Sequence, residues 1–161
     1  MIGLLADTHD NMKAIGEAVD FFNLRDVSLV LHAGDLISPF TAREFRRLNA
    51  PFRAVYGNNE GERDGLREKF KDLCNLSDFI ELEHNGKRIC VYHGTIPFIL
   101  KALEESQIYD LVVSGHTHNP ESRWTAKTLM VNPGECCGYL TGKKTIALVD
   151  SEDLSVEFVE L

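Results

Sequence analysis

Several sequence features that would place the chain in a specialised class are missing. No apolar run reaches the roughly 18 residues that a membrane-spanning helix needs, and there is no internal repeat, low-complexity segment or linker-like stretch. Basic residues are the minority: 17 Lys and Arg stand against 25 Asp and Glu, which gives a formal charge of −8. These absences exclude a membrane span, a coiled coil and a disordered chain, and they argue against broad nucleic-acid binding, which needs a basic face.

Cysteine is also sparse, and the spacing of the cysteines does not indicate a metal site. Cys74, Cys90, Cys136 and Cys137 form no C-x-x-C pair, so a zinc ribbon is not expected. Adjacent cysteines bridge only with strain, so we expect packed free thiols. The segment 1–6 lacks the basic flank of a signal peptide, which predicts a cytoplasmic protein. With 43% hydrophobic and 26% charged residues, the sequence predicts one globular domain over residues 1–161.

The first half alternates apolar runs with amphipathic stretches. We predict strands at residues 2–6, 28–32 and 52–56, and helices at residues 12–24 and 61–73. A further helix is expected to begin at Ser38-Pro39, a capping residue followed by proline, and to carry Phe40, Phe45 and Leu48. Such alternation implies right-handed crossovers and a parallel sheet.

The second half is richer in short strands. Asn85-Gly86 lies between two apolar segments, 78–84 and 87–92, and predicts a hairpin. We expect a helix at residues 97–106 and strands at 111–114, 122–126, 128–132, 145–150 and 155–159. The sequence therefore predicts an α/β fold with two packed sheets and helices outside them.

Polar side chains gather directly after five of the predicted strands. In open α/β sheets, ligands bind outside the carboxyl ends of the strands, so we expect these clusters to converge on one crevice. Seven of the side chains can ligate a metal ion through nitrogen or oxygen: Asp7, His9, Asp35, Asn58, His93, His116 and His118.

The composition of this set favours metal over coincidence. Taken singly, Gly34-Asp35 and Asn58-Asn59 are ordinary turn sequences. Together, imidazoles, carboxylates and one amide oxygen suit Mn²⁺, with Ni²⁺, Fe²⁺ and Zn²⁺ as alternatives. Seven ligands exceed what one tetrahedral ion takes and suit two divalent ions if one carboxylate bridges them. We expect structural roles for the other histidines, His32 near a strand end and His84 beside the hairpin turn.

The motifs resemble, in their order, those of the calcineurin-like metallophosphoesterase superfamily. That family has Asp-x-His, Gly-Asp, Gly-Asn-His followed by an acidic residue, His, and Gly-His-x-His; the match here spans residues 7–118. The short length and the segment 132–138 are similar to the small archaeal and bacterial phosphodiesterases. The resemblance implies a four-layer α/β/β/α sandwich, two mixed sheets flanked by helices, and a phosphoric ester hydrolase.

The resemblance also implies a ligand set. Asp7, His9 and His118 would hold one ion, Asn58, His93 and His116 the other, and Asp35 would bridge them. Two ions about 3.5–4 Å apart can clamp a phosphoryl group and activate a bridging hydroxide for in-line attack. Two divalent ions, two aspartates and a hydroxide leave one positive charge, which suits a phosphodiester; the motifs contain no Lys or Arg to balance a monoester dianion.

One position departs from the family pattern. The third motif has Asn59 where the family has a histidine thought to protonate the leaving group. General acid catalysis is worth about 10²–10⁴-fold, and an amide cannot give up a proton near neutral pH. We expect Asp35 and Asn59 to be the catalytic positions, and hydrolysis to be best on esters with good leaving groups.

Two other functions stay open from the sequence alone. The small subunit of the retromer coat resembles the same superfamily and is a non-catalytic scaffold, while a phosphomonoesterase or nucleotidase would need basic residues beside the crevice. The expected substrate is a small phosphodiester or nucleotide, with no membrane partner; symmetric self-association is common in small domains. Thr95 and the segment 135–139 are expected to lie beside the crevice.

Overall fold

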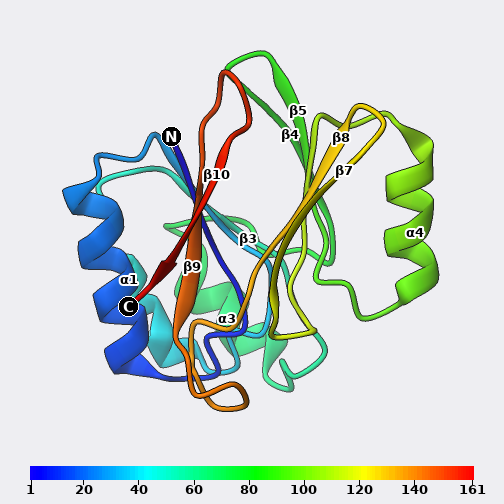
Figure 1. Cartoon of the computed structure of the whole chain (residues 1–161). Helices are drawn as coiled ribbons and strands as arrows, with labels where there is room; N and C mark the ends of the chain where they lie inside the picture. The colour runs from blue at the N-terminus through cyan, green and yellow to red at the C-terminus, as the bar shows by residue number, and fades with distance from the viewer.

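The computed structural model describes residues 1–161 and contains two five-stranded mixed sheets (Figure 1). The first sheet has the order β10-β9-β1-β2-β3. Strands β1, β2 and β3 are parallel to one another, while β9 runs antiparallel to β1 and β10, at the edge, runs antiparallel to β9. The strands are β1 (Ile2–Leu5), β2 (Leu29–His32), β3 (Phe52–Ala54), β9 (Thr145–Val149) and β10 (Val156–Glu160).

The second sheet has the order β4-β5-β6-β8-β7. Its three central strands are parallel, while both edge strands are antiparallel to their neighbours. The strands are β4 (Ile80–His84), β5 (Lys87–Val91), β6 (Leu111–Val113), β7 (Pro120–Thr125) and β8 (Thr128–Pro133). Asn85 and Gly86 both have positive φ, 50° and 74°, which confirms the predicted tight hairpin between β4 and β5.

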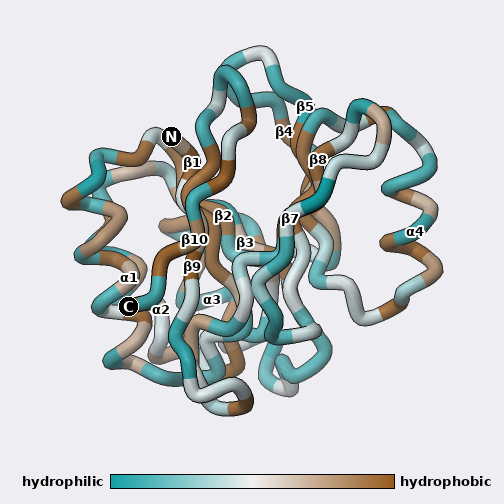
Figure 2. Tube along the Cα trace, viewed as in Figure 1, coloured by the Kyte–Doolittle hydropathy of each residue, from teal (hydrophilic) through white to brown (hydrophobic).

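Successive side chains along a strand point to opposite faces of the sheet, which divides the core into layers. Leu4 and Leu31 belong to the apolar layer that joins the two sheets, whereas Leu5 and Val30 pack with the helices on the outer face of the first sheet. Hydrophobic residues are concentrated on the strands (Figure 2). The helices are α1 (Met12–Leu24), η1 (Pro39–Thr41), α2 (Ala42–Phe45), α3 (Arg63–Phe70) and α4 (Pro97–Ser106).

Helix α4 covers the opposite side of the molecule from α1 (Figure 1). It packs Leu100 and Leu103 on a small cluster on the outer face of the second sheet, which includes Cys90 and Val112. The four-layer α/β/β/α arrangement is therefore confirmed. No helix in the structure combines the length and the apolar character required to cross a membrane.

The segment after Ser38 is the main local difference from expectation. It forms a short 3₁₀ turn and a four-residue helix, and Phe40 is 57% exposed while Phe45 is buried. The Ser38 hydroxyl caps no helix; it donates a hydrogen bond to Asp10 at 2.6 Å. Tertiary bonding has replaced the predicted cap, so the helix starts later and stays short.

Gly65 does not interrupt α3 as its residue type suggested. A Cβ at this position would lie 2.6 Å from the Glu62 carboxylate and 3.0 Å from the ring of Pro39. The glycine therefore allows α3 to approach the η1 turn closely.

The four cysteines are buried and free, as expected.

Candidate metal centre

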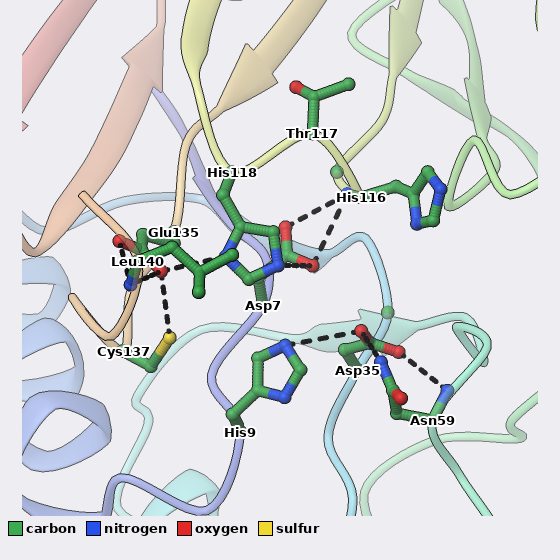
Figure 3. Close-up of polar contacts among 12 residues, drawn as sticks. Asp7, His9, Asp35, Asn59, His116, Thr117, His118, Glu135, Cys137 and Leu140 are labelled. Atoms are coloured by element: carbon green, nitrogen blue, oxygen red, sulfur yellow. Dashed lines mark hydrogen bonds and ion pairs between the residues drawn. The ribbon is translucent and has the colours of Figure 1, made fainter.

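The loops after β1, β2, β3, β5 and β6 carry the seven candidate ligands. Figure 3 shows Asp7, His9, Asp35, His116 and His118 gathered in one region. Five of these residues have φ in the left-handed region, between 39° and 70°, which L-residues rarely adopt: Asp7, His9, Asp35, His116 and His118. Such backbone strain concentrates at functional sites, where the surrounding structure imposes it. These turns place the side chains of Asp7, His9, Asp35 and His118 close to one another.

Asp7, His9 and His118 form the first group. Their candidate ligand atoms lie within 4.8 Å of one another. His118 Nε2 is 3.6 Å from the Asp7 carboxylate, and the rings of His9 and His118 are 5.2 Å apart. His9 Nε2 is buried and, although 3.3 Å from Asp35, makes no hydrogen bond of acceptable geometry. A buried nitrogen without a hydrogen-bond partner fits a metal ligand.

Asp35 lies between the two groups. It is 1% exposed, with one carboxylate oxygen 3.3 Å from His9 Nε2 and the other 3.6 Å from His93 Nε2. Burial alone would raise the pKa of Asp35, but the adjacent His9 side chain and two hydrogen bonds from Asn59 hold it well below its ordinary value. Its carboxylate is therefore ionised and can face ligands of both groups.

The second group consists of Asn58, His93 and His116, and two of its hydrogen-bond acceptors face each other. His93 Nδ1 lies 2.7 Å from the Ala33 carbonyl, to which only an N–H can donate, so the neutral ring carries a lone pair on Nε2. Burial lowers the pKa of His93 and favours this neutral form. That lone pair is 3.0 Å from the amide oxygen of Asn58, also an acceptor. A cation held by both atoms would resolve the repulsion.

His116 is the last of the seven candidate ligands, and it is held less closely to the others. Its ring centroid is 5.2 Å from that of His93, and its backbone N–H donates to both oxygens of Asp7 at 3.3 and 3.0 Å. The structure thus brings together all seven predicted residues, although the His116 ring projects away from the Asp7 carboxylate (Figure 3). The donor set, the buried His9 nitrogen and the opposed acceptors all fit divalent metal.

Asp7 is completely buried, which is costly for a carboxylate without sufficient counter-charge. Burial raises its pKa to about 7, even though His118 and the His116 amide both favour the ionised form. The metal-free site is therefore short of positive charge around Asp7, which agrees with a centre built for cations.

Glu135 contacts the candidate ligand His118, an interaction that the sequence did not reveal. Its buried carboxylate accepts a hydrogen bond from His118 Nδ1 at 2.8 Å, so His118 presents Nε2 towards Asp7 (Figure 3). The same carboxylate accepts bonds from the backbone N–H groups of Tyr139, Leu140 and Thr141. Hydrogen bonds from His118 and Thr141 outweigh burial and lower the pKa of Glu135 to about 2.

Replacing Glu135 by glutamine is expected to weaken divalent-metal affinity about 10–100-fold, because outer groups that orient a histidine ligand typically contribute this much. Isothermal titration of metal-free protein with Zn²⁺ measures the effect. Glu17→Gln removes a carboxylate that pairs with Lys144 away from the centre and is the control. Equal affinities for Glu135→Gln and Glu17→Gln would show that Glu135 does not orient the ligand.

Two residues of the third motif, Glu60 and Asn59, hold it in place. Glu60 accepts hydrogen bonds from the backbone N–H of Leu36 at 2.6 Å and of Gly57 at 2.7 Å, so it ties the second and third loops together. Burial raises the pKa of Glu60. Asn59 donates from its backbone and side chain to the two oxygens of Asp35, at 3.0 and 2.6 Å. Its amide is therefore already engaged with the central carboxylate.

His32 has the structural role expected from the sequence. Its Nδ1 accepts a hydrogen bond from the Gly34 N–H at 3.1 Å, so its Nε2–H donates to the Thr8 hydroxyl at 3.0 Å. The Thr8 hydroxyl in turn donates to the Asp35 carbonyl at 3.3 Å. Complete burial lowers the pKa of His32 to about 3. This neutral ring joins the loops that carry Asp7 and Asp35.

The free energy of unfolding is expected to fall as pH falls from about 6.5 towards 3. In that window the unfolded chain protonates His32 and the folded chain does not, which costs about 1.4 kcal/mol per pH unit. His32→Asn should show about 2 kcal/mol less loss than the parent between pH 7.5 and about 5, in urea unfolding with chelator. His84→Asn, at a half-buried position beside the hairpin turn, is the control; identical slopes for the parent and His32→Asn would contradict the assignment.

A further residue outside the motifs lies beside the centre. Arg63 lies over the ring of Tyr56, with 4.4 Å between guanidinium carbon and ring centroid, and it pairs with Asp78 at 2.7 Å. It also approaches the Gly57 carbonyl at 3.4 Å. Thr95 lines the same groove as Asn58, as suspected from its place after His93. No sequence pattern singles out Arg63, because its position depends on the start of α3.

The sequence and fold were compared with known proteins. Residues 1–154 match the model of the calcineurin-like phosphoesterase superfamily domain. A phosphodiesterase of Methanocaldococcus jannaschii is 42% identical over 154 residues, which cover 94% of this chain and 93% of that protein. A probable metallophosphoesterase of Methanothermobacter thermautotrophicus is 33% identical over 168 residues, covering 99% of this chain and 91% of that protein.

Solved structures show the same relationship. An archaeal phosphodiesterase superposes with a TM-score of 0.95 at 40% sequence identity, covering 99% of both chains. Vps29 of Chaetomium thermophilum superposes with a TM-score of 0.70 at 19% identity, covering 99% of this chain and 96% of that chain. The second similarity establishes a shared fold only.

Proposed function

The chain belongs to the calcineurin-like phosphoesterase superfamily, and from this premise we propose that it is a phosphodiesterase that uses two divalent metal ions. The observation that carries the proposal is the pair of opposed acceptors, His93 Nε2 and the Asn58 amide oxygen, 3.0 Å apart beside the Asp35 carboxylate. Neutral protein groups alone leave this arrangement repulsive, whereas a cation would satisfy it. The similarity to an archaeal phosphodiesterase supports the same activity.

The proposed roles follow from the two groups of side chains. Asp7, His9 and His118 would hold one ion, Asn58, His93 and His116 the other, and Asp35 would be shared between them. Mn²⁺ is the proposed ion, because mixed nitrogen and oxygen ligands suit it, with Ni²⁺, Fe²⁺ and Zn²⁺ as alternatives. When bound, such ions supply positive charge to the phosphoryl oxygens and lower the pKa of water.

The residues of the chain itself would position the reaction. Asp35 would keep the two ligand groups in register, Glu135 would keep His118 in the correct tautomer, and Glu60 would hold the third loop against the second. Asn59 carries amide protons rather than a titrating group, so it can donate a hydrogen bond to a phosphoryl or leaving oxygen without transferring a proton.

A diester is the favoured substrate class because little net positive charge surrounds the centre. Arg63 is the basic residue beside Asn58, but its ion pair with Asp78 offsets its charge. A monoester dianion would require further cations, so the phosphomonoesterase or nucleotidase alternative is less favoured. The scaffold alternative does not explain why seven potential metal ligands converge.

The proposal is tested with metal-stripped protein assayed on bis(4-nitrophenyl) phosphate and on 4-nitrophenyl phosphate, with and without Mn²⁺. Metal-dependent turnover of the diester, with slower turnover of the monoester, is expected. Faster monoester turnover would identify a phosphomonoesterase. No turnover of either ester by protein that retains two bound ions would favour the scaffold.

Rates on a series of aryl and alkyl diesters are expected to depend steeply on the pKa of the leaving alcohol, because Asn59 cannot act as a general acid. Asn59→His should raise rates on poor leaving groups, by up to about 10²-fold, and change those on nitrophenyl esters little. Steady-state kinetics across the series, with metal content measured for both proteins, provide the test. A flat dependence for the parent with chemistry rate-limiting would show that another group supplies the proton.

A further inference from the structure

A groove of about 360 Å³ adjoins the proposed metal centre at Asn58. It lies between the loop that joins β3 to α3 and the segment that joins β5 to α4. Its volume falls within the roughly 300–1,000 Å³ of small-molecule sites. The residues that matter for its chemistry are Tyr56, Asn58, Arg63, Tyr92, Ile96 and Ile99.

The groove offers apolar surface to a ligand. Ile96 and Ile99 at the start of α4 are 51% and 38% exposed, so their side chains are accessible to a ligand. On another wall, the guanidinium of Arg63 is held over the Tyr56 ring and fixed by Asp78. A planar cation on an aromatic ring, opposite branched aliphatic side chains, is suited to a flat ligand.

The groove also carries unused hydrogen-bonding groups. The Tyr56 hydroxyl is buried and has no hydrogen-bond partner, in a residue only 5% exposed. The Tyr92 hydroxyl accepts a bond from the Ile96 N–H at 3.0 Å, and its own proton has no acceptor among the protein groups. The Tyr56 hydroxyl is covered by protein, whereas Tyr92 is only half-buried, so its free O–H is available to donate to a ligand with polar edges.

The position of the groove relates these features to the substrate. Asn58 belongs both to the groove and to the proposed metal ligands, and Thr95 is two residues after His93. A phosphorus atom held at the centre would therefore have one ester substituent directed into the groove. Alkyl chains would use its apolar surface and leave the Tyr92 O–H unpaired, whereas a nucleobase has flat faces together with carbonyl and ring-nitrogen edges.

We infer that this groove is a specificity subsite that binds the nucleoside group of a phosphodiester substrate. The inference rests on the proposed phosphodiesterase function and adds to it the class of ester substituent. It assigns Ile96 and Ile99 to contact with the base, and the Tyr92 O–H to its polar edges.

Two diesters with the same leaving group test the subsite. Thymidine 5′-(4-nitrophenyl phosphate) and methyl 4-nitrophenyl phosphate both release nitrophenolate and differ in the retained substituent. The Mn²⁺-loaded protein is expected to show kcat/KM at least about tenfold higher for the nucleoside ester, since contact with a base face is worth about that factor. Equal kcat/KM values for the two esters would overturn the inference.

Matched substitutions on α4 localise the effect. Ile99→Asp places a charge on the groove wall and should lower the ratio of the two kcat/KM values by about tenfold. Phe98→Asp makes the same kind of change at a neighbouring position that is 78% exposed and outside the groove, and should leave the ratio unchanged. A ratio unaffected by Ile99→Asp would overturn the assignment of this wall.

Binding without turnover separates the subsite from the proposed function. With Zn²⁺-loaded protein labelled at isoleucine methyl groups, thymidine 5′-monophosphate is expected to shift the NMR signals of Ile96 and Ile99, and inorganic phosphate is not. These shifts in a protein that hydrolyses no diester would support the nucleoside site and reject the phosphodiesterase. Absence of shifts at saturating nucleotide would reject the site whatever the activity.

Discussion

Asp35→Asn is expected to lower metal-dependent diester hydrolysis by at least about 10³-fold, the largest effect of any single isosteric change in the centre. The carboxylate approaches His9 on one side and His93 on the other, at 3.3 and 3.6 Å. The amide keeps the shape but removes a full negative charge from a 1% exposed position between both ligand groups. Metal content should fall below two ions per chain, which elemental analysis of the reloaded protein measures.

Asp10→Asn is the matched control for this prediction. Asp10 follows the first motif, but its carboxylate bonds to the backbone and hydroxyl of Ser38 rather than to a candidate ligand. Asparagine can keep one of these bonds, so activity and metal content should change less than about tenfold. Comparable losses in Asp35→Asn and Asp10→Asn would mean that general disturbance of these loops, and not loss of a shared ligand, explains the result.

Gly57→Ala is expected to lower activity by about 10²-fold and to destabilise the fold by about 1–3 kcal/mol. A Cβ on Gly57 would lie 2.1 Å from one carboxylate oxygen of Asp35 and 2.6 Å from its backbone nitrogen. Either Asp35 or the loop that carries Asn58 must then move by an ångström or more. Kinetics on bis(4-nitrophenyl) phosphate and urea unfolding measure the two effects.

Gly61→Ala provides the control within the same loop. A Cβ at Gly61 would meet no atom within 4 Å, and Gly61 is not among the glycines with positive φ. Its activity and stability should therefore match those of the parent. If Gly57→Ala also behaved like the parent, the close approach of Gly57 to Asp35 would have no functional meaning.

Local sequence patterns predicted the elements that depend on local chemistry. The bounds expected for α1 and α4 agree with the structure, and the Asn85-Gly86 hairpin lies where two residues of positive φ allow it. The ligand cluster could also be anticipated, because the carboxyl ends of parallel strands lie at one edge of a sheet and the motifs follow five such ends.

Features that depend on tertiary contacts could not be read in the same way. Glu135 reaches His118 because the loop at residues 139–141 wraps its backbone amides around the carboxylate, and no spacing rule encodes that contact. Likewise, the hydrogen bonds that Glu60 accepts from Leu36 and Gly57 follow from the fold and from no local pattern. The short helix after Ser38 reflects competition by Asp10 for the capping hydroxyl.

The measurement that tests the central claim most directly is a titration of metal-free protein with Mn²⁺, in which bound ions and hydrolysis of bis(4-nitrophenyl) phosphate are followed in the same samples. The seven-ligand centre predicts that activity rises with occupancy and reaches its plateau at about two ions per chain. Full activity in metal-free protein, or two tightly bound ions per chain with no hydrolysis, would contradict the assignment of this centre to phosphodiester hydrolysis.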